Sequence, residues 1–277
     1  MTKQVEVVII GVGGIGSRMA DDAAKLLAFP SPKMREHWGD EFAPRLTLVD
    51  GDAYEERNLE RQSFTRIGNK AESKRTDLKK LYPGLDILAM QEFLCPENAP
   101  FILTEDATVL ICVDNHATRK LISEYIRDGN VQDITVINGG NDTAGHGDAH
   151  FYVVRGGKDL TPSLLQVDPA IAEPKEKPVW EMSCEERAQA GEPQLFVANV
   201  FAATAMLGML YGFLSNPDDC IDKAVGNQKN EYVDPGVTWT TFDIEFVAMR
   251  SERETCHPVV AEQSDPQEGV KQQEEAA

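Results

Sequence analysis

The glycine-rich segment GVGGIGSRMADDAAKLL (residues 11–27) directly follows the apolar run VEVVII (5–10), and this pair decides the fold class. A β-branched run bounded by glycine has the pattern of a strand covered on both faces, and residues 14–28 have the pattern of a helix. Within the turn, Gly11, Gly13 and Gly16 fit the spacing G-x-G-x-x-G, and Gly14 lies between them. These positions permit a tight turn, close approach of the backbone to phosphate, and packing of the helix against the strand. Because backbone N–H groups and the positive end of the helix face an anion there, we predict a nucleotide site, either for a redox dinucleotide or for ATP.

Strands and helices alternate through the first half of the chain. We expect further strands at 46–49, 86–90, 108–113 and 133–137, helices at 70–82 and 115–127, and a loop insertion at 29–45. This alternation predicts a Rossmann-like α/β fold with a doubly wound, mostly parallel sheet that binds ligands at the carboxyl ends of its strands. Beyond residue 140 the pattern changes. We expect strands at 149–155 and 239–249, with a long loop at 156–193 between them, as an antiparallel C-terminal extension of the sheet.

The composition narrows the class of protein. A formal net charge of −19 repels nucleic acid and anionic lipid, so we expect no nucleic-acid or membrane partner. The five cysteines are scattered and form no C-x-x-C pair, which argues for a reducing compartment and against a disulfide framework or a four-cysteine zinc site. The N-terminus MTKQVEVVII lacks the features of a signal peptide, so we expect a cytoplasmic protein.

One apolar segment tests that expectation. Residues 194–214 are about as long as a membrane span and contain the spacing Gly208-x-x-x-Gly212, which dimerising membrane helices use. However, Asn199 and Thr204 interrupt the segment, and no lysine or arginine lies close on either side. We therefore interpret it as a buried or subunit-facing helix of a globular domain rather than as a membrane helix.

The segment DGDAYEERNLERQ (50–62) bears on the choice of nucleotide. Asp50 follows the second expected strand, where a carboxylate can hold ribose hydroxyls of either nucleotide. Asp52, Asn58, Arg61 and Gln62 follow it. A dehydrogenase has no evident need for an arginine and an asparagine just beyond the ribose position. An enzyme that breaks a triphosphate does, because arginine can fork onto phosphate oxygens and asparagine can fix a phosphate or a metal-bound water.

Two further motifs supply a cation and a carboxylate. In GNKAESK (68–74), Lys70 lies at the start of an expected helix, from which it can reach the β- or γ-phosphate. In ICVDNHATRK (111–120), Asp114 leaves a buried strand and Asn115 opens a helix, at the edge where the strand order should reverse. A carboxylate there can bind Mg²⁺ that bridges the phosphates, although an Asp-Asn pair is also a common helix cap.

These four motifs, in this order, resemble the ThiF/MoeB-type adenylating enzymes, which are related to the adenylation domain of ubiquitin-activating enzymes. The resemblance runs from Val5 to about Leu214 and rests on G-x-G-G-I-G-S, D-x-D-x5-N-L-x-R-Q, I-G-x-K-A-E and D-N-x-x-x-R. The cysteine-bearing loop and the long apolar helix after it look most like the ThiF-type members of PRTRC gene systems. The second motif is the most specific of the four.

The resemblance implies ATP-dependent adenylation of the C-terminal glycine carboxylate of a ubiquitin-like or sulfur-carrier protein, with release of pyrophosphate. By position, Asp50 would hold ribose, while Asn58, Arg61 and Lys70 would hold the phosphates. Asp114 would bind Mg²⁺ and serve the transition state. The implied domain spans residues 1–257, with a nucleotide-binding half at about 1–140 and a half for partner binding and homodimer contacts at about 141–257. The Glu/Gln-rich residues 258–277 have no aromatic residue, and we expect a disordered acidic tail.

The sequence departs from the family in three respects. One is that we expect no separate catalytic-cysteine domain or ubiquitin-fold domain of the kind that large ubiquitin-activating enzymes carry. The chain also lacks the paired C-x-x-C motifs of MoeB-like members, so we predict no zinc. Many members send an arginine from an N-terminal segment into the neighbouring subunit's site. Only four residues precede the first strand here, so we expect that contribution to be missing or to come from elsewhere, and Arg18 and Arg57 are candidate substitutes.

Cys184 lies in the long loop, where related enzymes can place a cysteine that accepts the acyl group as a thioester before a conjugating-enzyme-like acceptor. Glu185 and Glu186 would raise the pKa of its thiol, which disfavours that role, whereas the positive charge of Arg187 would offset them.

Other interpretations stay open at this point. The glycine turn and Asp50 also fit an NAD(P)-dependent Rossmann oxidoreductase, and a degenerate family member could be a non-catalytic scaffold that binds a nucleotide or a ubiquitin-like protein. Activation of a small-molecule or tRNA-borne carboxylate is a fourth reading. We expect the Asn138-Gly139-Gly140-Asn141-Asp142 segment to shape the groove for an incoming glycine tail. His146, Asp148 and His150 alternate along a strand but lack a further ligand, so we do not predict a metal site there.

Overall fold

The computed structural model of the chain describes residues 4–39, 42–59, 62, 64–141, 146–183, 186, 195–225 and 239–243. Its strands are β1 (Gln4–Ile10), β2 (Ala43–Val49), β3 (Ala53–Tyr54), β4 (Gly68–Asn69), β5 (Asp86–Met90), β6 (Thr108–Ile111), β7 (Ile134–Asn141), β8 (His146–Arg155), β9 (Lys158–Asp159) and β10 (Trp239–Asp243). Its α-helices are α1 (Gly14–Ala28), α2 (Pro32–Trp38), α3 (Lys70–Leu81), α4 (Ala99–Ile102), α5 (His116–Arg127), α6 (Leu164–Val167), α8 (Phe196–Ser215) and α9 (Pro217–Val225). Short 3₁₀ turns at Glu56–Asn58, Pro169–Ala172 and Val179–Glu181 complete the described elements.

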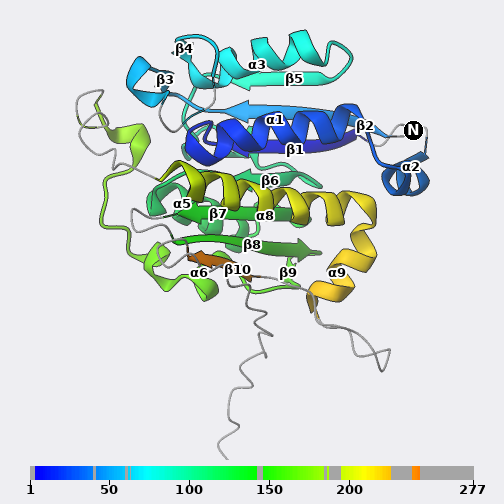
Figure 1. Cartoon of the computed structure of the whole chain (residues 1–277). Helices are drawn as coiled ribbons and strands as arrows, with labels where there is room; N and C mark the ends of the chain where they lie inside the picture. The colour runs from blue at the N-terminus through cyan, green and yellow to red at the C-terminus, as the bar shows by residue number, and fades with distance from the viewer. Residues whose placement is uncertain are drawn as a thin grey trace, which may run out of the picture.

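The central sheet has the strand order β10-β8-β7-β6-β1-β2-β5, with β9 paired to β8 (Figure 1). The five strands from β7 to β5 pair in parallel. β8 then pairs antiparallel with β7, and β10 pairs antiparallel with β8. The expected doubly wound, mostly parallel sheet with an antiparallel extension is confirmed. The strand order reverses between β1 and β6, so their carboxyl ends form the crevice in which such sheets bind ligands.

Helices cover both faces of the sheet, and each face has its own apolar cluster. α1 and α8 lie side by side on one face (Figure 1), where Ile9, Met19 and Met206 belong to one cluster. α5 belongs to the cluster of the opposite face, with Val8 and Ile122. On its buried side α1 carries mostly small side chains, including three alanines, and these let α8 approach closely. Burial of each large aliphatic side chain contributes about 1.5–3 kcal/mol, so these two clusters fix the fold.

The segment at 29–45, expected to be a loop, contains helix α2, and the loop expectation is wrong for that part. Ser31 caps the helix by accepting a hydrogen bond from the N–H of Met34, and Pro32 occupies the first turn. These are strong helix-start signals. Gly39, with φ of +57°, ends the helix. Trp38 donates its Nε1–H to the backbone oxygen of Leu214 at 2.7 Å, so α2 docks on the end of α8.

Further boundaries also differ from expectation, and β8 begins at His146 rather than at residue 149. β2 begins at Ala43, before the expected residue 46, and β6 ends at Ile111 rather than at 113. β7 continues through Gly139 and Gly140 to Asn141, because its pairing with β8 carries the ladder that far. The expected loop at 156–193 contains β9, α6 and two 3₁₀ turns within its described part. The remainder of the expected strand at 239–249, and the tail, lie outside the described residues.

Helix α8 is long and apolar enough to span a membrane, judged by length and composition alone. In the structure it packs against α1, β7 and β8, and its buried side chains include Ala202, Met206 and Leu210. Gly139 is a glycine because a Cβ there would lie 2.3 Å from the Sδ of Met206. The helix therefore belongs to the core of the domain. Its outer side carries exposed apolar side chains, which are those of the N-cap residue Leu195 and of Phe196, Val197 and Tyr211.

Candidate nucleotide site

The glycine turn joins β1 to α1 at the crevice, and close contacts within the protein require three of its glycines. Gly11 has φ of +87°, and a Cβ there would lie 2.9 Å from the Val113 side chain and 3.0 Å from the Cys112 oxygen. A Cβ on Gly16 would lie 1.8 Å from the Gly11 oxygen. A Cβ on Gly14 would meet the Asn199 side chain at 2.5 Å. At Gly13, by contrast, a Cβ would meet only Gln62, at 3.8 Å.

Asp50 anchors the turn from the end of β2. It is buried, and its Oδ2 accepts a hydrogen bond from the N–H of Val12 at 2.6 Å while its Oδ1 accepts one from the N–H of Asp52 at 2.8 Å. Burial raises the pKa of the Asp50 carboxyl, and the charge of Lys70 opposes that rise. Tyr54, which sequence reasoning missed, donates its hydroxyl to the oxygen of Val12 at 2.8 Å. Asp50 and Tyr54 together hold the peptide between the first two glycines of the motif.

Lys70 begins α3, as expected, and its side chain lies close to Asp50 and Asp52. Its Nζ lies 2.7 Å from Oδ2 of Asp52, and its side chain is only 10% exposed. Asn69 caps the helix and also donates its Nδ2–H to the backbone oxygens of Asp50 and Asp52, at 2.8 and 3.2 Å. The structure thus brings the 50–52 and 69–70 segments together beside the glycine turn. A lysine held in this way is a fixed positive charge at the mouth of the nucleotide site.

The other candidate residues of the 50–62 motif, and the two candidate substitute arginines, differ in their surroundings. Asn58 is buried, but its Oδ1 accepts the N–H of Glu55 at 2.9 Å and closes a capping box around the 3₁₀ turn. The sequence analysis did not predict that the Asn58 oxygen takes part in a capping box, although the spacing E-x-x-N indicates one. Gln62 lies near Gly13, and its Oε1 is buried with no hydrogen-bond partner in the described part of the chain. Arg61 and the side chain of Arg57 lie outside the described residues, and Arg18 pairs with Asp22 on the exposed side of α1.

Asp114 and Asn115 follow β6 at the crevice. Asp114 is exposed, and the residue before it, Val113, contacts the glycine turn at Gly11. Asn115 is the N-cap of α5 and accepts the N–H of Thr118 at 2.8 Å, which is the capping alternative noted for this pair. Glu176, from the segment after α6, accepts hydrogen bonds from the N–H groups of His116 and Ala117. The chain itself therefore engages the first turn of α5 and leaves the Asp114 carboxylate exposed beside it.

An exposed carboxylate at this position fits Mg²⁺. This ion is usually held by one or two carboxylates together with water and substrate phosphates, and not by a cage of protein ligands. The described residues contain no group of three or more His, Cys, Asp or Glu side chains that could hold a metal. Within the described residues, Asp114 would therefore hold Mg²⁺ together with the phosphates of a bound nucleotide rather than in a cage of protein ligands.

Arg119, the last residue of the D-N-x-x-x-R motif, is buried behind Asp114. Its Nη2 donates to the backbone oxygens of Val113 and Gly139, at 2.9 and 3.2 Å, and so ties the end of β6 to β7. The side chain of Asp148 lies next to Gly140 close to this guanidinium. Burial raises the pKa of the Asp148 carboxyl, and the charge of Arg119 opposes it. Sequence reasoning identified the motif but not this task, because it depends on backbone oxygens distant in sequence.

Two of the thiols described in the structure, those of Cys112 and Cys220, are poor nucleophiles. Burial raises the pKa of the Cys112 thiol, and burial next to Asp219 raises that of Cys220 to about 11. A raised pKa keeps a thiol protonated at neutral pH, which makes it unreactive. Cys184, the expected acyl acceptor, lies outside the described residues.

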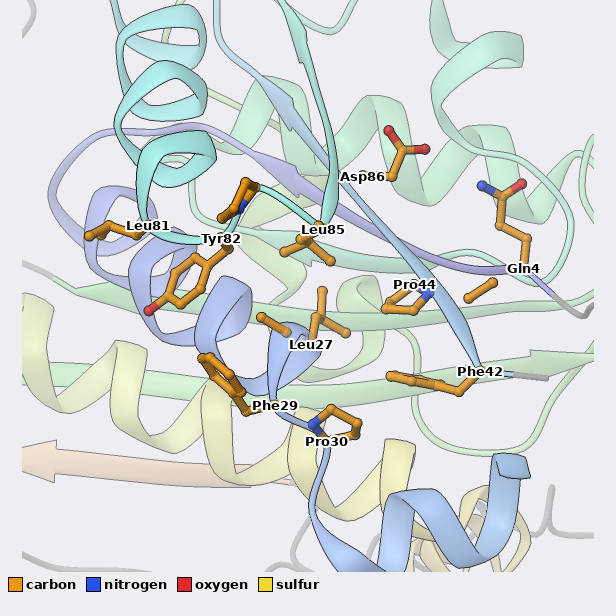
Figure 2. A pocket seen from close by; sticks show the side chains of 14 residues that line it. Gln4, Leu27, Phe29, Pro30, Phe42, Pro44, Leu81, Tyr82, Leu85 and Asp86 are labelled. Carbon is orange, nitrogen blue, oxygen red and sulfur yellow. The ribbon is translucent and has the colours of Figure 1, made fainter. Parts of the chain in front are cut away.

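A groove of about 700 Å³ lies at the opposite edge of the sheet (Figure 2). Its walls come from the ends of α1 and α3 and from the amino ends of β1, β2 and β5, with Phe29, Pro44 and Tyr82 among them. The carboxyl ends of the same strands carry the glycine turn and Asp50. The groove is therefore separate from the candidate nucleotide site.

Comparisons with known proteins identify the family of the chain. Residues 2–238 match the family described as "ThiF family". The "adenylyltransferase and sulfurtransferase uba4" of Aspergillus niger is 38% identical over 126 residues, which are 44% of this chain and 23% of that protein. The "adenylyltransferase and sulfurtransferase MOCS3" of Drosophila sechellia is 36% identical over 126 residues, 44% of this chain and 24% of that protein. The chain thus matches less than a quarter of the length of these relatives.

Solved structures share the fold. E. coli MccB with ATP aligns with a TM-score of 0.59 at 16% identity and covers 92% of this chain and 64% of MccB. E. coli MccB with MccA-N7isoASN aligns with a TM-score of 0.60 at 17% identity, over 92% of this chain and 65% of MccB. At such low identity the likeness concerns the fold alone.

Proposed function

This chain belongs to the ThiF family, and we propose on that basis that it adenylates the C-terminal carboxylate of a ubiquitin-like or sulfur-carrier protein, using ATP and Mg²⁺. The observation that carries the proposal is the cluster of Asp50, Asp52 and Lys70 beside the open glycine turn. A redox dinucleotide would use Asp50 and the turn but not a buried lysine next to them. The names of the relatives, adenylyltransferases, support the same choice.

In the proposed reaction the protein positions two substrates and neutralises charge. The N–H groups at the start of α1 bind phosphate, and Asp50 accepts a hydrogen bond from a ribose hydroxyl. Lys70 changes its partner from Asp52 to a phosphate oxygen, and Arg61 and Asn58 are proposed to bind the same phosphates. Asp114 would hold Mg²⁺, which would supply positive charge to the leaving pyrophosphate.

The bond changes balance without any redox partner. A carboxylate oxygen of the incoming glycine forms a bond to the α-phosphorus, the bond from that phosphorus to the bridging oxygen breaks, and the electron pair leaves with pyrophosphate. At the carboxyl end of β7, the Gly139 oxygen accepts a hydrogen bond from Arg119, which also binds the Val113 oxygen beside the glycine turn. This contact supports our placing the glycine tail at the end of β7. The product is an acyl adenylate, which a thiol could capture as a thioester.

Cys184 is the thiol that we propose for this capture, because it lies in the loop where related enzymes can place an acceptor cysteine. Cys112 and Cys220 are less suited, since burial raises the pKa of both thiols. We also propose a homodimer that uses the exposed apolar side chains of α8, with a conjugating-enzyme-like protein as a further acceptor. Intact-mass measurement with ATP and a small protein ending in two glycines tests the thioester. A covalent mass increase that disappears in Cys184→Ala would support it, and an identical increase in the variant would refute it.

Exchange of labelled pyrophosphate into ATP tests the proposed activity. We expect exchange that requires a partner with a free C-terminal glycine and that falls at least 100-fold in Asp114→Asn, because an amide does not replace the carboxylate on Mg²⁺. Tight binding of NADH in place of Mg-ATP would refute the proposal. Mg-ATP binding without exchange in the presence of any such partner would show a nucleotide-binding scaffold instead.

A further inference from the structure

Asn199 is a buried amide inside α8, the long apolar helix. Its neighbours in α8 are Ala198 and Val200, and its side chain is on the side of the helix that packs against the rest of the protein. The residue is 1% exposed. A primary amide in such a place must satisfy two donors and one acceptor, and any of these left unmade is unfavourable.

Only part of that hydrogen-bonding capacity is met within the described residues. The Oδ1 of Asn199 accepts a hydrogen bond from Nδ2 of Asn141 at 2.9 Å. Its own Nδ2 is buried and has no partner in the described ranges. Buried polar groups in native proteins are nearly always paired, so an unpaired donor next to a candidate site indicates an absent acceptor.

The donor lies at the start of α1. A Cβ built on Gly14, the first residue of that helix, would lie 2.5 Å from Nδ2 of Asn199. The residue before it, Gly13, has no side chain with which to cap the helix, and no acidic residue occupies the first turn. The amide N–H group and the positive end of α1 therefore favour the same kind of acceptor, an anionic oxygen.

We propose that Nδ2 of Asn199 donates a hydrogen bond to a phosphate oxygen of the nucleotide bound at the glycine turn. This assignment rests on the proposed function for the existence of the nucleotide, and it adds a ligand-binding residue from a helix outside the four sequence motifs. Through Asn141 the same amide reaches the end of β7. Asn199 would thus contact both the bound phosphate and, through Asn141, the end of β7 where we place the glycine tail.

Asn199→Leu tests the proposal, since leucine has a similar volume and cannot donate. We expect an affinity for Mg-ATP at least about tenfold lower, as for loss of one hydrogen bond to a charged group. The melting temperature should change little, because the variant loses the hydrogen bond from Asn141 but no longer buries an unpaired donor. An amide with a purely structural role would give the opposite pattern, a lower melting temperature and an unchanged affinity. That pattern would overturn the proposal.

Two more variants complete the set. Asn199→Asp keeps an acceptor for Asn141 but puts a negative charge against the phosphate, and we expect it to weaken Mg-ATP binding more than leucine does. Thr204→Val is the matched control on the exposed side of α8, where the threonine hydroxyl donates to the oxygen of Val200 at 2.8 Å. We expect this variant to bind Mg-ATP like the wild type. If Asn199→Asp binds Mg-ATP as tightly as the wild type, the proposal is wrong.

The source of the oxygen is settled by titrating adenosine, AMP and ATP, and separately the dipeptide Gly-Gly. A phosphate acceptor predicts that Asn199→Leu loses affinity for AMP and ATP but not for adenosine. A loss confined to Gly-Gly would assign the amide to the substrate carboxylate and overturn the phosphate assignment. The proposed function fails separately, if wild-type protein binds Mg-ATP with the expected dependence on Asn199 yet never exchanges pyrophosphate.

Discussion

Replacement of Lys70 by methionine would remove the cation nearest to the proposed phosphates, and Lys74 offers a matched control one turn further along α3. Both side chains are almost fully buried, and each pairs with one carboxylate. Lys70 is 2.7 Å from Asp52 and Lys74 is 3.0 Å from Asp21. The two carboxylates are also similarly exposed, at 43% and 38% of their side chains. Only Lys70 is next to the glycine turn, since the Lys74 pair joins α3 to α1.

The two variants should lose similar amounts of stability. An exposed ion pair contributes about 0.2–1 kcal/mol, and loss of one partner of a fully buried pair costs about 3–5 kcal/mol. With one partner buried and the other partly exposed, we expect about 1–2 kcal/mol for each methionine variant. Lys70→Met should be at the upper end, because the buried carboxylate of Asp50 also loses a nearby positive charge. Urea unfolding at pH 7 measures this difference directly.

Their nucleotide affinities should differ. A hydrogen bond to a charged group contributes about 1.5–3 kcal/mol, so Lys70→Met should bind Mg-ATP about 10- to 100-fold more weakly than the wild type. Lys74→Met should bind it within about twofold of the wild type. Isothermal titration at two salt concentrations is the assay, because a direct phosphate contact should also weaken as ionic strength rises. Equal losses of Mg-ATP affinity in the two variants would refute the assignment of Lys70 to the phosphates.

Three other predictions concern single side chains. Gly16→Ala should destabilise the protein by about 3 kcal/mol or more in urea unfolding, because its Cβ would lie 1.8 Å from a backbone oxygen, whereas Gly13→Ala should mainly weaken Mg-ATP binding. Tyr54→Phe leaves the buried oxygen of Val12 without its donor and should cost about 1–2 kcal/mol in the same assay. Burial lowers the pKa of His150 to about 4, against about 6.5 when unfolded, so stability should fall as pH drops between those values, by up to roughly 3 kcal/mol. His150→Gln should flatten that part of the pH profile, and an unchanged slope would contradict the reasoning.

Local patterns sufficed for the parts of the fold that local physics controls. The glycine spacing and the apolar run predicted β1, the turn and α1, and the expected strand at 86–90 coincides with β5. Helix α2 could also have been predicted, because Ser31-Pro32 at its start and Gly39 at its end are standard signals. The three prolines of that insertion favoured a loop, yet Pro32 is in the first turn, where proline is tolerated. The error was therefore one of weighting and not of missing information.

Contacts between distant segments could not be predicted from local patterns. Asn199 was noted only as an interruption of an apolar helix, because nothing in its neighbourhood shows that it meets Gly14. The backbone oxygens that Arg119 binds follow β6 and lie in β7, and the sequence does not show that these points converge. Asn58 was assigned to phosphate by resemblance, whereas its oxygen closes a local capping box. A motif identifies which residues lie together at a site. It does not show which of their polar atoms are already hydrogen-bonded within the protein and which can bind a ligand.

The glycine turn shows why the same motif serves proteins with different ligands. Gly11 is required by the end of β6, Gly14 by Asn199 and Gly16 by the backbone of the turn itself, so three of the four glycines satisfy contacts within the protein. Gly13 alone has an open approach, with its nearest neighbour at 3.8 Å. The spacing of the glycines therefore reflects mainly the packing of the strand, the helix and their neighbours. Only Gly13 leaves room for a ligand to approach the backbone. The identity of that ligand depends on the side chains that surround the turn. Here these are the buried side chains of Lys70, Asp50 and Asn199, and the Nδ2 of Asn199 has no hydrogen-bond partner in the described part of the chain.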